Sequence, residues 1–469
     1  MGYAVLLLAT CLVAYPDSAV VISRLGHEGG LAPSFMRAIS RDGRGWVHVA
    51  FAYNIGFPLA ESAEVFYTFS TDDGQNWAPL ENVSRNDSFT VCVPALTVDA
   101  ASVVHCVWNQ FWIDSSGTRH YDFFYASRDS TGWSVAANVS RLGWNTNAFY
   151  EAGIVVDRLG RPHVVFHYGY NRSRYDGAIY HCYKDGDTWT RPFCLTPVPI
   201  WENQYPSLTI DRRGRLHVAW MLYEFASNRD TIYYALYDSV WHPAEVVYAA
   251  GIVAGVPCIA VDSSNTPWVA FIAGPFGGAN DVYCAHRDST GWHCMNISNS
   301  PEQCYEVGIT LDRNDHVYVV WPEFVPERDL FMRTYDGHAW SAIQNLTADS
   351  GFASFAGQLA FPTGDRIDLA WRSRDPTLRS DEVVYMRLSR VVAGFAEPSH
   401  LWTAPMPRAT LNPTREPAAF STAGTVYAAS GRQVRSIGHN TGSTVHLPAG
   451  VYFYRPEDRG QTRKLVVVR

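Results

Sequence analysis

Apolar and polar residues alternate along most of the chain, in units that repeat about every 50–58 residues. In the clearest unit, residues 205–220, one alternating stretch runs into a turn at 211–214 and a second apolar stretch leaves it. Aspartate at the first position of such a turn accepts backbone N–H groups, and glycine at the fourth adopts the positive φ that closes a hairpin. Further strand-like stretches follow at 231–236 and 245–248. The unit is therefore predicted to be a four-stranded antiparallel sheet.

The copies of this unit can be counted on the aromatic residue that ends each second strand. That residue stands at Phe51, Trp108, Phe166, Trp220, Phe271, Trp321 and Trp371. A second series marks the turn after each third strand, at Trp77, Trp133, Trp189, Trp241, Trp292 and Trp340. The spacing is typical of propeller blades rather than of helical repeats. Two markers in the same phase predict an all-β fold with a seven-bladed β-propeller over residues 20–390.

The order of the repeats also predicts how the ring closes. Asn-x-Ser/Thr triplets mark the fourth strand at Asn82, Asn138, Asn296 and Asn345. The seventh unit has no clear fourth strand, whereas residues 21–26 look like a fourth strand without its blade. Residues 20–24 are therefore expected to complete the last blade, which removes the exposed edges of an open array. The triplets match glycosylation sequons, but their recurrence at one blade position indicates a structural role.

Composition narrows the functional classes. The 469 residues are 47% apolar, 14% aromatic and 17% charged, as in a well-packed β protein. The net charge of −8 and pI near 6.0 argue against a nucleic-acid partner. No apolar run reaches the roughly 18–20 residues of a membrane span. Residues 4–14 are apolar and suit a signal peptide, with cleavage after Ala14 or Ala19, although a buried first strand is the alternative. We therefore expect residues 1–19 to direct export.

Export would leave eight cysteines in the mature chain and permit their oxidation. Cys182 and Cys194 flank one tryptophan turn, and Cys284 and Cys294 flank another at nearly the same spacing. Residues equidistant from a hairpin tip face each other, so Cys182–Cys194 and Cys284–Cys294 are predicted disulfides, with free thiols as the alternative. No pair has the short spacing of a zinc site, so neither a metal nor another cofactor is expected.

The best tryptophan turn, residues 70–77 (STDDGQNW), resembles the Asp-box of sialidase-like, BNR-repeat β-propellers. The matching residues are Ser70, Asp72, Gly74 and Trp77. The resemblance implies that the aspartate accepts N–H groups of the turn and that the tryptophan packs beneath it. It also implies that these turns lie on the face away from the ligand site.

The same resemblance raises the alternative of an exo-sialidase-like glycoside hydrolase. Such enzymes use three arginines, a Tyr–Glu nucleophile pair and an acid. The candidates in this chain are Glu151, Tyr305, Glu306 and Arg372. Both glutamates precede the same apolar strand of their units, which suggests a repeat feature. The family's enzymes have six blades, and their arginine triad is not matched here, so we favour a protein without catalytic activity.

Aromatic and polar residues cluster in the loops that follow the second strands and precede the first strands. The candidate ligand-binding residues are Tyr53, Trp112, His167, Tyr168, Trp201, Glu202, Tyr223 and Glu323. Aromatic faces beside carboxylates suit sugar rings and their hydroxyl groups. The alternative is that these aromatics pack between blades, and His48, His163 and His217 are expected to be structural. The sequence predicts an exported, monomeric protein that binds a glycan or a surface protein.

The phase of the repeats breaks near residue 391. Residues 391–411 form a proline-containing linker, and 412–469 contain short strands separated by glycine turns, which predicts a small immunoglobulin-like β-sandwich. Asn412-Pro413, VYAASGRQV at 426–434, LPAGVYF at 447–453 and the final KLVVVR resemble the C-terminal sorting domain of the bacterial type IX secretion system. The resemblance implies that the type IX machinery is a partner and that the protein is secreted or reaches the bacterial cell surface.

Overall fold

The computed structural model contains two compact units, residues 1–341 with 349–393, and residues 394–469 with 342–348. Within the first 390 residues it describes 19–23, 37–54, 63–85, 94–141, 151–169, 177–196, 202–224, 229–249, 253–275, 278–324, 328–347, 353–360, 366–374 and 381–389. Beyond residue 390 it describes strands only. The described residues include no helix that is long and apolar enough to cross a membrane.

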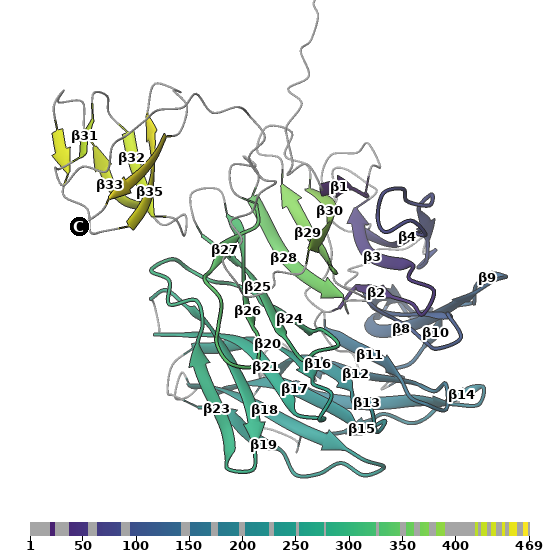
Figure 1. Cartoon of the computed structure of the whole chain (residues 1–469). Helices are drawn as coiled ribbons and strands as arrows, with labels where there is room; N and C mark the ends of the chain where they lie inside the picture. Colours follow the sequence, from purple (N-terminus) through teal and green to yellow (C-terminus); the bar gives the residue numbers. More distant parts are fainter. Residues whose placement is uncertain are drawn as a thin grey trace, which may run out of the picture. The chain divides into compact units, whose positions relative to one another are not determined.

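Seven antiparallel sheets follow one another along the chain and form the predicted seven-bladed propeller (Figure 1). The first three contain β2 (Ile39–Arg41), β3 (Val47–Asn54), β4 (Ala63–Ser70) and β5 (Glu81–Asn82); β6 (Ala95–Val98), β7 (Val104–Ile113), β8 (Arg119–Asp129), β9 (Gly132–Trp133) and β10 (Ala137–Asn138); and β11 (Ala152–Val156), β12 (Pro162–Gly169), β13 (Gly177–Asp185), β14 (Thr188–Trp189) and β15 (Phe193–Cys194).

The remaining sheets keep this order. They contain β16 (Glu202–Ile210), β17 (Leu216–Glu224), β18 (Arg229–Tyr237) and β19 (Glu245–Tyr248); β20 (Val253–Val261), β21 (Pro267–Gly274), β22 (Asp281–Asp288) and β23 (Gly291–Asn296); β24 (Gly308–Leu311), β25 (Val317–Glu323), β26 (Asp329–Tyr335) and β27 (Gln344–Asn345); and β28 (Ala353–Ala360), β29 (Arg366–Arg374) and β30 (Asp381–Ser389) with β1 (Ala19–Val21).

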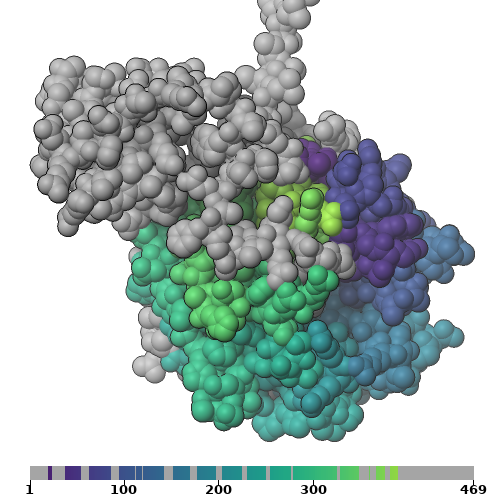
Figure 2. All heavy atoms as spheres, in the orientation of Figure 1, coloured from purple at the N-terminus to yellow at the C-terminus, as the bar shows by residue number. Residues whose placement is uncertain are grey.

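The N-terminal strand closes the ring, as the sequence predicted. β1 pairs with β30, with Ala19 opposite Met386 and Val21 opposite Val384. The pairing continues where Ile22 N–H donates to the Val383 carbonyl (2.9 Å). In Figure 2 the yellow-green surface of the seventh blade meets the purple surface of the first. The first and last parts of the propeller sequence therefore share one sheet.

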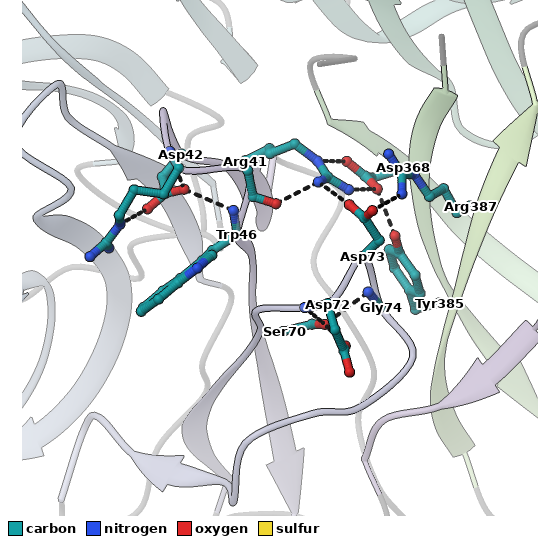
Figure 3. A network of polar contacts seen from close by, with 12 residues as sticks. Arg41, Asp42, Trp46, Ser70, Asp72, Asp73, Gly74, Asp368, Tyr385 and Arg387 are labelled. Carbon is teal, nitrogen blue, oxygen red and sulfur yellow. Dashed lines mark hydrogen bonds and ion pairs between the residues drawn. The ribbon is translucent and has the colours of Figure 1, made fainter. Parts of the chain in front are cut away.

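A buried ion-pair network joins the first blade to the seventh (Figure 3). Arg41 donates to both oxygens of Asp368 (2.7 and 2.6 Å), and their side chains are only 2% and 1% exposed. The Tyr385 hydroxyl donates to the same carboxylate (2.6 Å). Asp73 accepts from Arg41 (2.8 Å) and from Arg387 (2.5 Å). Side chains from β2, β29 and β30 and from the turn after β4 thus lock the joint between the two blades.

The hydrophobic core is divided among the joints between neighbouring blades. Along β3, Val49 and Phe51 pack with the seventh blade, and Ala50 and Ala52 pack with the second. Alternation places successive residues on opposite faces of a sheet, so each blade contributes to two such cores. This explains the continuous apolar character of the second strands.

The tryptophans of the predicted turns pack at these same joints. Five of the six stand edge-on against a ring on the third strand of a neighbouring blade, with centroids 4.9–5.2 Å apart; the pairs are Trp77 with Tyr385, Trp133 with Tyr67, Trp189 with Tyr125, Trp241 with His181 and Trp292 with Tyr234. Trp340 instead packs on Tyr335 of its own blade. In the 70–77 turn, Asp72 accepts the Asn76 N–H (2.8 Å) and the Trp77 indole donates to the Gly74 carbonyl (3.0 Å). Aspartate and tryptophan thus have the structural roles expected at this turn.

The triplets of the fourth strands are structural as well. In the first blade the Ser84 hydroxyl accepts the Val65 N–H (3.0 Å) and donates to Glu64. The same contacts link Ser140, Ser298 and Ser23 with the third strands and acids of their own sheets. A side chain thus supplies a ladder bond where the short fourth strand ends. This recurring use explains the recurring sequence.

Buried contacts that join an aspartate, a histidine and a third polar side chain, here called relays, recur on the face that carries the turns between first and second strands. The Asp42 carboxylate accepts two turn N–H groups and lies 3.6 Å from His48, whose Nδ1 contacts the Tyr67 hydroxyl (2.7 Å). Asp99 with His105 and Tyr125, and Asp211 with His217 and Tyr234, repeat the arrangement. Asp157 and His163 repeat it with His181 as the third group. The histidines in the second strands are therefore held in structural contacts.

Acidification below pH 6.5 is expected to destabilise the propeller, with His48 as one source of the effect. Burial lowers the pKa of His48 to about 4, outweighing the attraction of Asp42, whereas an unfolded histidine titrates near 6.5. Between these values only the unfolded chain binds the proton, so the free energy of unfolding falls as the pH falls. One such histidine contributes a slope of up to about 1.4 kcal/mol per pH unit.

Urea unfolding of wild type and His48→Gln between pH 7 and 5 tests this expectation. The variant should show a shallower dependence of stability on pH. His242→Gln is the control, because that side chain is 45% exposed. Equal slopes for wild type and His48→Gln would contradict the role assigned to burial.

The two predicted disulfides are wrong. Cys182, Cys194, Cys284 and Cys294 are all free thiols. In the third blade Cys194 stands opposite Tyr180, two residues away from Cys182. In the fifth blade Cys294 stands opposite Ala285, so Cys284 points to the other face of the sheet. Spacing about the turn did not fix the register, and Cys92 lies outside the described residues.

The C-terminal unit is also made of strands. β31 (Ala418–Phe420) pairs with β34 (Ser443–Val445), while β32 (Gly424–Ala428), β33 (Gln433–Ile437), β35 (Gly450–Pro456) and β36 (Arg463–Val467) form one sheet in the order β33-β32-β35-β36. The motif segments 426–434 and 447–453 thus contribute to neighbouring strands. The predicted sandwich packing and sorting role stay predictions.

Candidate functional site

The propeller has two unlike faces. The turn face carries the connections from first to second and from third to fourth strands, including the relays described above. The mouth face carries the connections from second to third strands and the segments that enter each first strand. The serine–acid contacts of the fourth strands recur at the mouth face, and other polar or aromatic groups at its described strand ends differ between blades.

The structure places the predicted ligand-binding residues in different environments. Tyr53 and Tyr168 are buried in the cores between blades, and His167 is fully buried. Glu202 and Tyr223 are brought together, directly opposite each other on β16 and β17, and Tyr223 is half-buried. Trp201 lies outside the described residues. For Tyr53 and Tyr168 the alternative of packing between blades is therefore the one observed.

A polar cluster joins the mouth ends of the third and fourth blades. The Glu151 carboxylate accepts the backbone N–H of Tyr205 (2.7 Å) across the boundary between the blades. The Glu151 carbonyl accepts the His167 N–H (3.1 Å). The Asn203 amide donates to the Gly177 carbonyl (3.0 Å) and accepts from the Trp220 indole (3.1 Å). Glu151, predicted as a catalytic candidate, is thus built into this joint.

Two features of this cluster restrict its backbone. A side chain at Gly177 would meet His167, because an added Cβ would lie 2.2 Å from Nε2. Tyr205 has φ +54° at a bulge in β16, a conformation that non-glycine residues rarely adopt. Such strain persists only where the surrounding contacts hold it, and it concentrates at functional sites. The bulge recurs, however, in β20, where Val256 has φ +49°, and in β28, so it belongs to the repeat and does not by itself mark a site.

The remaining catalytic candidates lie on the sixth and seventh blades. Arg372 and Arg374 both donate to Asp381, the latter at 2.7 Å. This contact raises the pKa of Arg374. One carboxylate thus holds both guanidinium groups at the mouth end of this blade. Tyr305 is exposed and Glu306 beside it is half-buried. As the sequence suggested, Glu151 and Glu306 occupy equivalent places before β11 and β24.

The second blade presents a long hairpin on the mouth face, formed by the ends of β7 and β8. The His120 ring stacks on the Trp112 indole, with centroids 4.4 Å apart, and its Nε2 contacts the Asp114 carboxylate (2.8 Å). The Trp112 indole donates to the buried Asp122 (2.9 Å). Hydrogen bonds from Ser116, Thr118 and His120 lower the pKa of Asp114 well below its usual range. The hairpin therefore offers an imidazole oriented by a carboxylate.

Sequence reasoning found Trp112 but missed His120. The usable signal was the spacing of an aspartate six residues before a histidine across a glycine turn, which lets the two side chains meet across the hairpin. A carboxylate that holds one ring nitrogen fixes the tautomer of the imidazole and leaves the other nitrogen for a ligand. Acid–base chemistry is within reach of such a pair.

The sixth blade contributes a buried carboxylate, Glu323, at the end of β25. Its oxygens accept from the Trp321 indole (2.9 Å) and the Ser300 hydroxyl (3.0 Å). Burial raises the pKa of Glu323 despite these bonds. The site can thus hold a proton more readily than an exposed glutamate. Among the residues that the structure describes, no group of three or more His, Cys, Asp or Glu could hold a metal ion.

Comparison with known proteins finds similarity in fold only. No family model and no curated protein matches the sequence. A solved polysaccharide lyase, an ulvan lyase bound to -[GlcA(1-4)Rha3S]-, matches with TM-score 0.58 at 10% identity over 80% of this chain and 95% of that chain. The polysaccharide lyase Uly1 matches with TM-score 0.52 at 9% identity, over 77% and 91% of the two chains.

A protein of unknown function from Dyadobacter fermentans gives TM-score 0.51 at 11% identity, with 80% of this chain and 98% of that chain covered. A microbial sialidase matches with TM-score 0.45 at 12% identity over 73% of each chain. The chain thus shares its propeller fold with the two solved polysaccharide lyases.

Proposed function

We propose that the protein recognises a polysaccharide at its mouth face. One observation carries the proposal. On the turn face the same relay recurs, with the triads Asp42–His48–Tyr67, Asp99–His105–Tyr125 and Asp211–His217–Tyr234. Residues that recur from blade to blade in this way serve the fold. On the mouth face the serine–acid contacts also recur, but further polar groups stand in single blades, such as the His120–Asp114 pair of the second blade, and a repeat has no structural need of them.

The groups at the mouth match the chemistry of sugars. The Trp112 indole and the Tyr223 ring offer surfaces for the C–H faces of pyranose rings, while Glu323 and His120 can bond hydroxyl groups. A few fixed polar groups among aromatic surfaces are typical of small-ligand and sugar sites. The fold likeness to two polysaccharide lyases supports a glycan over a protein ligand. Recognition without turnover remains the first hypothesis.

Elimination of a uronate-containing polysaccharide is the second candidate, favoured by the His120–Asp114 pair and by the lyase fold. An oriented imidazole suits removal of a proton next to a carboxylate group. Sialidase-type hydrolysis has less support, because Arg372 is engaged with Asp381 and the Tyr305 ring lies against Arg328. The proposal also includes export and a cell-surface or secreted location through residues 1–19 and 412–469.

Replacing Trp112 with alanine is expected to weaken polysaccharide binding by about tenfold or more, because an aromatic anchor is lost. Trp112→Phe is the matched control, since it keeps a ring but loses the indole bond to Asp122. Binding is measured on a panel of immobilised plant, algal and animal polysaccharides, with thermal melting to confirm folding. Equal binding by wild type and the Trp112→Ala variant, or silence across the panel, would contradict recognition at this face.

The same panel separates binding from chemistry. Hydrolysis releases reducing ends without ultraviolet absorbance, whereas elimination also creates an unsaturated uronate that absorbs. An unsaturated uronate product that the wild type makes and His120→Ala does not would show that the protein is a lyase. Reducing ends without absorbance that are released by the wild type, but not by Glu306→Gln or Arg372→Ala, would support the hydrolase alternative. Binding with neither product supports the first hypothesis.

A further inference from the structure

Two large aromatic side chains remain exposed together on the mouth face of the sixth blade. Tyr305 lies in the segment that leads into β24 and is 38% exposed. Phe324 directly follows β25 and is 48% exposed. Their rings meet edge to face with centroids 6.3 Å apart. The guanidinium carbon of Arg328 lies 4.8 Å from the Tyr305 ring centre and 5.1 Å from that of Phe324. We call these three side chains the blade-6 platform.

The platform rests on segments that are tied to each other. The Phe324 N–H donates to the Gln303 carbonyl (2.9 Å), and Cys304 and Glu323 form an isolated β-bridge. The Cys304 N–H in turn donates to the Asn280 carbonyl (3.0 Å). The two rings therefore come from different loops but are held in one arrangement. A surface fixed before binding avoids the entropy cost of ordering flexible loops.

The backbone at the platform is also constrained. Arg328 has φ +51°, a left-handed conformation that costs a non-glycine residue free energy. The guanidinium is thus placed over the rings by a backbone that an arginine does not favour. Observed strain of this kind is a reason to look for function at the residue.

The chemistry of the platform selects a kind of ligand. Aromatic rings offer an apolar surface to the C–H face of a sugar, and a guanidinium offers a planar fork of N–H donors that fits a carboxylate or a sulfate. The chain as a whole carries a net charge of −8, so it does not attract polyanions by its overall field. An acidic polymer would have to be recognised by a local group such as Arg328.

We propose that the blade-6 platform is a subsite for an acidic sugar residue, with Arg328 binding its carboxylate or sulfate group and Tyr305 and Phe324 supporting its ring. This rests on the proposed polysaccharide recognition and narrows it to an anionic class. Burial raises the pKa of Glu323, one residue before Phe324, so this carboxylate opposes an anionic ligand less than an exposed glutamate would. The preference for acidic polymers would then follow from the Arg328 guanidinium beside the Tyr305 and Phe324 rings.

The test compares charged and neutral forms of the same polymers. Dextran sulfate is compared with dextran, and polygalacturonate with its methyl ester, alongside sulfated and desulfated forms of the other panel polysaccharides. Arg328→Gln is expected to weaken binding of the preferred charged form by about tenfold and leave the neutral form unchanged. Arg328→Lys should restore only part of the loss, because lysine keeps the charge but not the fork.

Tyr305→Ala and Phe324→Ala should weaken binding of the same charged ligand. Tyr305 and Phe324 are exposed and Arg328 is half-buried, so the variants should fold. Arg158→Gln, which makes the same charge change in an exposed turn on the turn face, is the control. Preference for neutral polymers, or equal loss in Arg328→Gln and Arg158→Gln, would overturn the subsite. The sulfate and methyl ester pairs identify the acidic group.

The outcomes also separate this subsite from the wider proposal. Charged polymers bound through Trp112 but unaffected by the platform variants would overturn the subsite and leave polysaccharide recognition standing. If the wild-type protein bound no polysaccharide of the panel, both the subsite and the proposed polysaccharide recognition would be overturned. Loss confined to the charged forms in Arg328→Gln supports both.

Discussion

Asp368→Ala is expected to lower the free energy of unfolding by about 3–5 kcal/mol, because it leaves a buried guanidinium without its carboxylate. The Arg41 and Asp368 side chains are 2% and 1% exposed and share two hydrogen bonds. The Tyr385 hydroxyl loses its acceptor in the same variant. Asp73 cannot replace the lost charge, since it is half-exposed and already shared with Arg387. Urea unfolding of the full chain measures the change.

Two controls separate this network from ordinary ion pairs. Glu245→Ala breaks the pair of Glu245 with Arg287, both 41% exposed, and is expected to cost no more than about 1 kcal/mol. Combining Asp368→Ala with Arg41→Met removes both buried charges and should recover much of the stability. Equal losses in the two single variants would show that the joint between the first and seventh blades does not depend on the network.

The strand pattern was predictable because two separate sequence signals mark it in the repeats. The second-strand aromatics and the tryptophan turns are local signals with a fixed phase, and both describe contacts that every blade must make. The ring closure could also be predicted, since residues 21–26 repeat a fourth strand that the seventh unit lacks. Ser23 then occupies the place that Ser84 has in the first blade, with the same hydroxyl contacts.

Register was not predictable from spacing. Cys182 and Cys194 are symmetric about their turn, but the outer strand divides into β14 and β15, and β15 pairs with Cys194 opposite Tyr180. In the fifth blade a continuous β23 still places Cys294 opposite Ala285. The tip of a hairpin fixes the register only when the number of turn residues is known.

The mouth residues were partly predictable. Tyr53 and Trp112 occupy similar strand ends, yet Tyr53 faces the core with Phe51 whereas Trp112 belongs to a hairpin that extends beyond the usual strand length. Sequence gives the strand end but not the face that a side chain takes there. Arg328 and His120 were missed for a related reason: their importance lies in rings and carboxylates that reach them from another loop or strand.

Gly74→Ala is expected to destabilise the propeller by about 2–5 kcal/mol, as the sum of an unfavourable backbone conformation and a clash in a packed joint. Gly74 has φ +86°, and a Cβ built there lies 1.9 Å from the Tyr385 ring. That ring is buried, stands edge-on to Trp77 and donates its hydroxyl to Asp368. The ring cannot withdraw without disturbing the buried ion pair shown in Figure 3.

Gly337→Ala isolates the two contributions, because Gly337 has φ +95° in the equivalent turn of the sixth blade with no atom near the added Cβ. It should cost only the backbone term of about 1–2 kcal/mol. The difference between the two variants, measured by urea unfolding under one set of conditions, is the cost of displacing Tyr385. Equal losses of stability in the two variants would show that the contact of Gly74 with Tyr385 does not contribute to the joint between the first and seventh blades. A larger loss in Gly74→Ala makes the Asp-Gly turn of the first blade part of the contact that holds the last blade.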